Sequence, residues 1–272
     1  MKNWKTALSR RKQRKAENTL SWILLALVLL VAYQVFLYMD ITNTIDNANI
    51  LLRSVWHGKI LDFYELSVQQ AKTNYAANYN FIIYIIFAVW QAPVYLLMHL
   101  LKKEYLDCVM AMLWSKGLVI LFFSVTVYWI KKIVEFCTGS REKGILAVFL
   151  YSSSMAVFYP VFICSQLDVI SMSFMLAGIY YYLKNQNKKF WLCFFIAIPC
   201  KMFAILLALP LILFRQKNIW KAALLWVSMM GLLLFEKLLF RNSPVYQYAL
   251  AAQSRDAIQS LLVYPSVINS TF

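Results

Sequence analysis

Residues 18–39 have the sequence NTLSWILLALVLLVAYQVFLYM and contain no charged side chain. A helix of this length can cross a hydrocarbon core about 30 Å thick, because each residue adds about 1.5 Å. Seven basic residues precede it within the first fifteen positions. The run is too long for a signal peptide, and no small-residue cleavage site precedes Asp40. We therefore predict a basic cytoplasmic tail over 1–18 and an uncleaved membrane-spanning helix over 19–39.

The composition of the whole chain agrees with this first segment. Of the 272 residues, 62% are hydrophobic and 14% are charged, whereas a soluble domain is nearer to half apolar and a quarter charged. The formal net charge of +15 comes from short basic clusters between apolar runs, which indicate membrane orientation and give no reason to expect nucleic acid. The five cysteines form no CxxC pair, so neither a disulfide framework nor a zinc site is indicated. The sequence predicts an all-α, polytopic transmembrane bundle in the lipid bilayer.

The chain divides further by polarity. Residues 40–80 are the only long polar stretch, and their apolar residues recur at near-helical spacing. This pattern predicts an outer loop that contains a juxtamembrane helix, with a stop at His57-Gly58-Lys59. A transmembrane bundle is predicted over 81–240, and 241–272 are predicted to be an outer loop or the truncated start of a longer continuation. The apolar runs of the bundle are 81–101, 106–130, 145–164, 169–183, 190–214 and 222–235.

Basic clusters between these runs favour one topology over another. Placing all of them in the cytoplasm requires that 81–101 lies at the outer interface or re-enters, for which Pro93 permits a break, and that 190–214 forms two half-helices hinged near Pro199-Cys200-Lys201. In the alternative, both runs cross once, and two clusters lie outside. The charge rule favours the first arrangement. The clusters are Lys131/Lys132 with Arg141/Lys143, Lys184/Lys188/Lys189, and Arg215/Lys217/Lys221.

Four polar residues are candidates for a site on the outer side. Asp40 follows the first apolar run, where a carboxylate suits a general base or merely ends the helix. Gln166 and Asp168 lie between two long apolar runs, and their neighbours are residues that seldom form turns. An acidic residue between two membrane helices indicates a functional site; the alternative is that the segment is an ordinary exposed turn. Lys201 stands alone in its apolar run, where it either snorkels or binds an anion such as a lipid phosphate.

Other polar residues have weaker signals. Asp46, Arg53 and His57 are further substrate-binding candidates in the outer loop. Arg53, His57 and Lys59 could hold a phosphate there, but for each of them a solvated helix face is the favoured interpretation. Lys116 lies near a helix end, and snorkelling is the favoured interpretation. The sequence contains no Walker loop, GxGxxG, GxSxG or HExxH motif, so nucleotide-driven transport and familiar hydrolase chemistry have no support.

Three short motifs carry a resemblance to a known family. The first comprises Tyr38-Met39-Asp40, Ala48-Asn49-Ile50-Leu51, and His57-Gly58-Lys59 through Tyr64. The second is Tyr159-Pro160 through Ser165-Gln166-Leu167-Asp168, in which Ser165 stands where glycine is usual. The third is Ala197-Ile198-Pro199-Cys200-Lys201 with Pro210. In order and spacing they resemble the GT-C superfamily of polytopic glycosyltransferases, within it the bacterial mannosyltransferase-like branch, and distantly the GPI-anchor mannosyltransferases.

The resemblance implies an inverting sugar transfer on the outer face of a bacterial plasma membrane. The donor would be a polyprenyl-phosphate sugar, and the acceptor a glycan, lipid or protein. Asp40 would be the general base, Asp168 with Gln166 would orient a sugar or help to hold a metal, and Lys201 would bind the lipid-linked phosphate. Whether a divalent cation takes part is left open, and no other cofactor is implied.

Two further classes of function are compatible with the sequence. A transporter or lipid-linked-glycan flippase would also be polytopic, although such folds show repeated halves with broken helices, and only one candidate break, near Lys201, is present. An inactive N-terminal fragment of a longer enzyme is the other alternative, because no closing helix follows Phe235.

Overall fold

The computed structural model describes residues 19–35 and 40–249, and every regular element among them is helical. The predicted tail over 1–18, the end of the first predicted span at 36–39, and residues 250–272 lie outside the described part. The first helix is Thr19–Gln34. The others are α2 (Asp40–Trp56), the 3-10 turn η1 (Ile60–Asp62), α3 (Phe63–Gln70), α4 (Phe81–Leu100), α5 (Val109–Thr138), α6 (Arg141–Ser153), α7 (Met155–Phe158), the π-helical turn η2 (Tyr159–Ile163), α8 (Asp168–Leu183), α9 (Asn187–Cys200), α10 (Ala204–Arg215), α11 (Ile219–Met229) and α12 (Gly231–Leu239).

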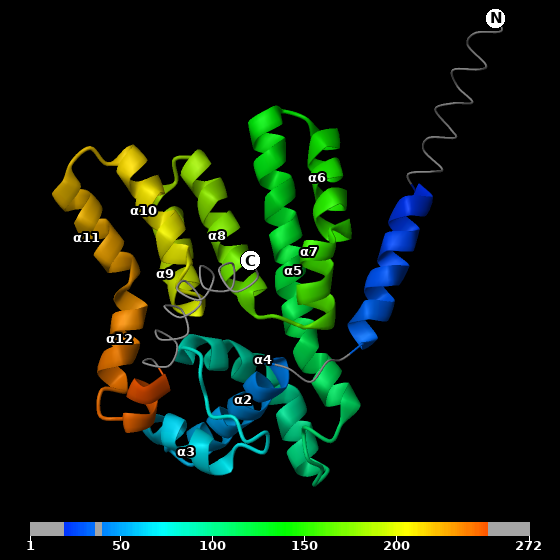
Figure 1. Ribbon diagram of the computed structural model, residues 1–272, viewed down its shortest axis with the longest axis vertical. Coiled ribbons are helices and arrows are strands. Elements are labelled where there is room, and N and C mark those ends of the chain that lie inside the picture. The colour runs from blue at the N-terminus through cyan, green and yellow to red at the C-terminus, as the bar shows by residue number, and fades with distance from the viewer. Residues whose placement is uncertain (1–18, 36–39, 250–272) are drawn as a thin grey trace, which may run out of the picture.

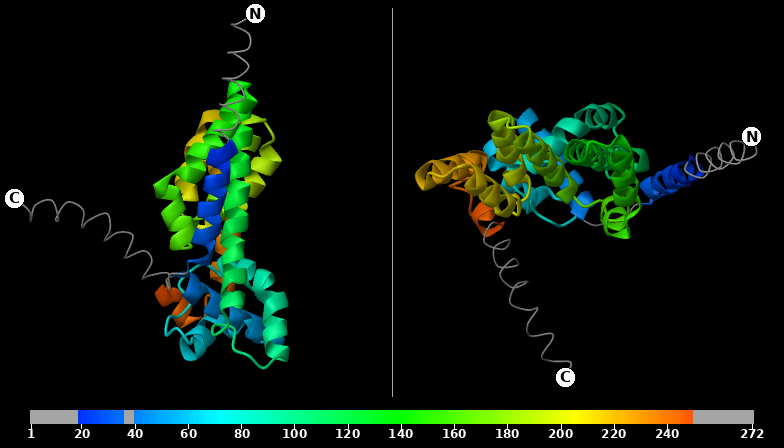
Figure 2. Two further views of the ribbon diagram at one scale, coloured as in Figure 1. Left: turned by 90° about the vertical axis from the view of Figure 1, so that its right-hand side faces the viewer. Right: turned by 90° about the horizontal axis from the view of Figure 1, so that it is seen from above.

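The helices form two parts, a bundle and a layer at one of its ends (Figures 1 and 2). Helix Thr19–Gln34 and α5 to α11 run roughly along the long axis of the molecule, whereas α2, α3 and α4 lie together at one end. The stretch predicted as an outer loop with a juxtamembrane helix therefore contains α2 and α3. Helix α2 ends as expected, because Gly58 takes a φ of 68° and the N–H of Lys59 donates to the Ser54 carbonyl at 2.8 Å.

Between two and four segments of the described chain are long and apolar enough to cross a membrane. Helices α4 and α5 qualify alone, and two bent pairs qualify together: α6 with α7 and η2, bent by 62°, and α11 with α12, bent by 48°. Neither bend was expected from the apolar runs. The break that Pro93 permits is absent, since α4 is continuous and packs on both α2 and α5, which hold it together across the missing hydrogen bond.

The break predicted in 190–214 is confirmed. Helix α9 ends at Cys200 and α10 begins at Ala204, while Lys201 between them has an extended backbone with φ −156° and ψ 124°. Helix α10 then returns toward the end from which α9 came (Figure 1). The loops α5–α6, α8–α9 and α10–α11 lie at one end of the bundle, opposite the layer, and the three basic clusters occupy these loops and the helix segments that adjoin them. The three clusters thus share one end of the bundle, which is one requirement of the arrangement that the charge rule favours.

Close packing fixes the end of the bundle where the site lies. Helix α8 packs against α9 and α5. A Cβ added at Gly178 of α8 would lie 2.6 Å from the Phe194 ring of α9, so glycine is what permits this approach. In the layer, α2 and α4 bury the side chains of Ile41, Ile45 and Tyr84 completely. Helix α9 also contacts α4 of the layer, and the Asn80 amide at the start of α4 donates to the Pro199 carbonyl near the C-terminal end of α9.

Candidate active site at the bundle–layer junction

The loop 71–80 connects α3 to α4 within the layer, and α2 anchors its beginning. The Asp46 carboxylate accepts from the backbone N–H of Thr73 at 2.9 Å and from its hydroxyl at 3.2 Å. The amide of Asn47 donates to the Tyr75 carbonyl at 3.0 Å. Both α2 side chains are buried, and a buried polar group contributes most when it is paired. Asp46 therefore positions the loop.

The end of the same loop is fixed by α4 and by the α9–α10 hinge. The buried Tyr84 hydroxyl accepts from the backbone N–H groups of Asn78 and Tyr79, at 2.9 and 3.1 Å. The Asn80 amide donates to the Pro199 carbonyl at 2.8 Å. Because Pro199 lies two residues before Lys201, this bond holds Tyr79 beside the hinge lysine.

Four side chains from separate parts of the chain meet at this point, and we call them the Asp40–Lys201 cluster: Asp40, Tyr79, Asp168 and Lys201. The Tyr79 hydroxyl donates to Asp40 Oδ2 at 3.2 Å. The Lys201 ammonium lies 5.7 Å from the centroid of the Tyr79 ring and 2.8 Å from Asp168 Oδ1. Both carboxylates occupy the first turn of a helix, where negative charge is stabilised.

The cluster is open to solvent. The side chains of Lys201 and Asp168 are 38% and 45% exposed, and Asp40 is also exposed. Burial, followed by the neighbouring Asp40 carboxylate, raises the pKa of Tyr79 well above its usual value. Tyr79 is therefore a neutral hydrogen-bond donor at any physiological pH. The arrangement offers an exposed carboxylate, which the Tyr79 hydroxyl holds, as a base and an ammonium for an anion, within one reachable surface.

Gln166 lies in the turn before α8, close in sequence to Asp168. It is exposed, and its backbone N–H donates to the Pro160 carbonyl at 2.9 Å. Ser165 in front of it has φ 53°, in the left-handed region that glycine adopts most readily. The predicted turn residues thus sit beside the cluster on a sharp turn that presents Gln166 outward.

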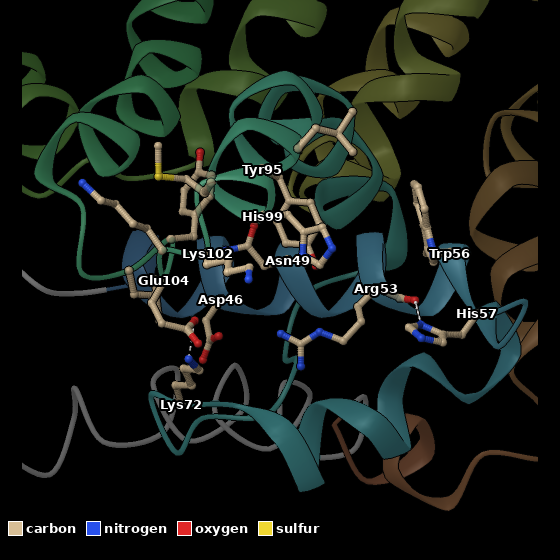
Figure 3. Close-up of a pocket in the computed structure, with 15 residues that line it drawn as sticks. Asp46, Asn49, Arg53, Trp56, His57, Lys72, Tyr95, His99, Lys102 and Glu104 are labelled. Carbon is tan, nitrogen blue, oxygen red and sulfur yellow. Dashed lines mark hydrogen bonds and ion pairs between the residues drawn. The ribbon is translucent and has the colours of Figure 1, made fainter.

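The remaining sequence candidates are placed elsewhere. Arg53 is thirteen residues after Asp40 in one continuous helix, about 20 Å along its axis at 1.5 Å per residue. Arg53, His57 and Asp46 line a cavity between α2, α4 and the loop after α4 (Figure 3). The structure brings Asp40, Asp168 and Lys201 together, with Gln166 beside them, and sets the other three apart from them.

Sequence reasoning missed two residues of this region. Tyr79 lies in a loop without a motif, and its role follows only from contacts with distant residues. Glu236 of α12 is 4% exposed, and its Oε1 accepts from the Phe81 N–H at 2.8 Å and from the Tyr64 hydroxyl at 3.2 Å. It thereby joins α12 to α3 and to the start of α4. The only sequence signal for Glu236 was its position as an acidic residue directly after the apolar run 222–235.

The snorkelling interpretation of Lys116 is wrong. Its side chain is fully buried, and its ammonium donates to the carbonyls of Ala32 at 3.0 Å and Val35 at 2.5 Å. These carbonyls end the helix Thr19–Gln34, where a cation complements the helix dipole. Lys116 therefore fastens the first helix to α5.

Within 19–35 and 40–249, no group of three or more His, Cys, Asp or Glu side chains is placed to hold a metal ion. Fold and site define this protein as all-helical in its described part, with two to four candidate membrane spans and a charged cluster at one end of the bundle. Comparison with protein-family models, with curated proteins and with solved structures found no match.

Proposed function

We propose that the protein is an integral-membrane glycosyltransferase that moves a sugar from a polyprenyl-phosphate carrier to an acceptor, with inversion at the sugar carbon. The observation that carries this proposal is the convergence of Asp40, Tyr79, Asp168 and Lys201 at one end of an apolar bundle. A lipid-linked phosphate arrives at the level where the helices leave the bilayer. The exposed carboxylate and the hinge ammonium lie where such a donor and an acceptor can meet.

The chemistry follows from the positions of the charged groups. The Asp40 carboxylate takes the proton of an acceptor hydroxyl, whose oxygen forms the new bond to the anomeric carbon of the sugar. The bond from that carbon to the phosphate oxygen breaks, and the phosphate leaves with the electron pair. Lys201 stabilises the charge that develops on it, as a preplaced cation does in a transition state. Attack opposite the leaving group inverts the anomeric carbon.

Tyr79 and Asp168 position these two groups. Tyr79 holds Asp40 through its hydroxyl and Lys201 through the face of its ring. Asp168 fixes the ammonium while no phosphate is bound, and, with Gln166, it is placed to bind hydroxyl groups of a sugar. The reaction would take place on the outer face of a bacterial plasma membrane, with the N-terminus in the cytoplasm and the basic clusters on the cytoplasmic side.

A lipid-linked-glycan flippase or other transporter is the second candidate. The two bent helix pairs and the break between α9 and α10 favour it, because transporters use discontinuous helices. Transporter sites lie near the middle of the membrane, however, whereas the Asp40–Lys201 cluster lies at one end of the bundle. Its position favours the transferase.

The decisive experiment is sugar transfer by membranes that carry the full-length protein, supplied with a radiolabelled polyprenyl-phosphate sugar and the membrane's own acceptors. Asp40→Asn should lower the rate at least 100-fold, at the low end of what a general base contributes, about 10² to 10⁴. Asp62→Asn is the matched control, since Asp62 is an exposed aspartate of the same layer whose side chain caps no helix. Full activity of Asp40→Asn would exclude Asp40 as the base, and uptake of solute without sugar transfer would favour the transporter.

A further inference from the structure

A second charged site lies in the layer, apart from the Asp40–Lys201 cluster. It is a cavity of about 620 Å³ between α2, α4 and the loop 101–106 (Figure 3). This volume is within the usual range of about 300 to 1,000 Å³ for small-molecule sites. The cavity is lined by Asp46, Asn49, Arg53, Trp56, His57, Lys72, Tyr95, Leu96, Met98, His99, Lys102, Lys103, Glu104, Tyr105 and Leu106.

The lining has an excess of positive charge. Four basic side chains face two acidic ones, with the histidines counted as neutral. Lys72 and Glu104 form an ion pair at 2.5 Å, which lowers the pKa of Glu104, so these two charges offset each other. Asp46 is engaged by both donors of Thr73. Among the described residues, Arg53, Lys102 and Lys103 form no ion pair, although Arg53 donates to the Gln70 side-chain oxygen at 3.2 Å and its charge also helps to lower the pKa of Glu104.

A buried polar group in the wall also lacks a partner. Asn49 is 5% exposed, and its Oδ1 makes no hydrogen bond within the part of the chain that the structure describes. Leaving such an acceptor unpaired costs about 1–3 kcal/mol. Figure 3 shows the Asn49 amide, the Arg53 guanidinium and the Lys102 side chain around the same space. A ligand with both an anionic group and a hydroxyl donor would satisfy all three.

Lys102 occupies this position although its backbone conformation is unfavourable for a lysine. It follows the end of α4 with φ 52°, while the next N–H, that of Lys103, donates to the Met98 carbonyl at 3.0 Å. Glycine is the usual residue at this position of a helix terminus. Cations also complement the C-terminal ends of α2 and α4, but that effect explains neither a lysine in place of glycine nor the unpaired Asn49 oxygen.

We infer that this cavity binds a phosphate ester that carries hydroxyl groups, such as a sugar phosphate or the headgroup of a phosphoglycerol lipid. Arg53 and Lys102 bind the phosphate oxygens, and Asn49 Oδ1, which is buried in the wall, accepts from a hydroxyl once the Asn49 side chain turns toward the cavity. The half-buried Tyr95 ring provides an apolar wall for the carbon skeleton. The inference concerns binding alone and does not depend on the transferase proposal.

The test uses the full-length protein in nanodiscs of zwitterionic lipid, titrated calorimetrically with glucose 1-phosphate. Lys102→Gly is the informative variant because it removes the cation and relieves the backbone at once. Affinity should fall about tenfold, as expected when one charge-assisted hydrogen bond is lost, while the melting temperature stays the same or rises. Arg53→Gln should weaken binding similarly. Lys188→Gln, which removes one positive charge from the exposed far end of the bundle, should leave binding unchanged.

A second arm identifies the source of the phosphate ester. Native mass spectrometry of protein from nanodiscs with phosphatidylglycerol counts retained lipid molecules. A retained lipid that is lost in Lys102→Gly supports the site with a lipid headgroup as its ligand, and calorimetric binding of glucose 1-phosphate supports it with a soluble one. If neither probe binds, or if Lys102→Gly and Arg53→Gln bind as the wild type does, the inference is overturned.

Discussion

Lys201 and Asp168 form a 2.8 Å ion pair although helices α8 and α9 separate them in the sequence. Asp168 begins α8 and Lys201 follows the last residue of α9. Because the two helices are antiparallel, the start of α8 and the end of α9 lie side by side. The Tyr79 ring lies against the same ammonium. The hinge lysine is thus held between an acid of the bundle and an aromatic ring from the loop of the layer.

This ion pair should matter for substrate binding and little for stability. Both side chains are more than one-third exposed, and such pairs contribute roughly 0–1 kcal/mol because water screens them. Lys201→Gln should therefore lower the free energy of unfolding by less than about 1 kcal/mol, yet raise the KM for a polyprenyl-phosphate sugar at least tenfold.

Lys201→Arg should recover part of the lost affinity, because a guanidinium also binds phosphate. Denaturant unfolding in detergent and initial rates of sugar transfer measure the two effects separately. A large loss of stability with an unchanged KM would show that the lysine serves only the fold.

The raised pKa of Tyr79 predicts that the protein loses stability at alkaline pH. Its pKa is raised above the usual 10.0, first by burial and then by Asp40, so folding favours the neutral phenol. Its contribution is complete below pH 10 and is lost as the pH rises through the raised pKa, because the unfolded chain releases the proton first. Melting temperatures from about pH 8 to about pH 11 should fall less steeply in Tyr79→Phe than in the wild type.

Tyr75→Phe provides the control for this experiment. Tyr75 lies in the same loop, and its side chain is 64% exposed, so its environment changes little on unfolding. The slope of melting temperature against pH should match that of the wild type. Equal slopes in all three proteins would contradict the partly buried, Asp40-linked position of Tyr79.

Ser165 should be a site where glycine stabilises the protein. The residue has φ 53° and is buried, and glycine adopts this conformation without the steric cost of a Cβ. Ser165→Gly should raise the free energy of unfolding by about 0.5–1 kcal/mol. Ser154→Gly is the control, because Ser154 has φ −67° and gains nothing from glycine. Destabilisation of both variants by the same amount would show that the backbone at Ser165 is not strained.

The sequence predicted the parts of the fold that depend on local chemistry. Gly58 ends α2, and the hinge before Lys201 separates α9 from α10, as expected from glycine and proline. The bends at Ser154 and Met230 were not predicted. Both lie within apolar runs, where composition does not distinguish a straight helix from a bent one.

The site was predicted only in part, for a related reason. Asp40, Asp168 and Lys201 stand out as charges beside apolar runs, so their isolation marked them. Tyr79 is one of many aromatic residues, and it bridges Asp40 and Lys201 because Tyr84 and Asn80 hold its backbone. Such long-range hydrogen bonds leave no periodic pattern, and Lys116 was misinterpreted because its partners are backbone carbonyls of another helix.

The orientation in the membrane is the last prediction. In a background without the five native cysteines, Asp168→Cys should react with a membrane-impermeant maleimide on intact cells, because the partly exposed end of α8 belongs to the layer side of the bundle. Lys188→Cys lies at the opposite end, among the basic clusters, and should react only after the cells are opened. The reverse labelling would place the Asp40–Lys201 cluster in the cytoplasm and exclude sugar transfer on the outer face. Labelling of both variants from the same side would contradict the proposal that the two ends of the bundle lie on opposite sides of the membrane.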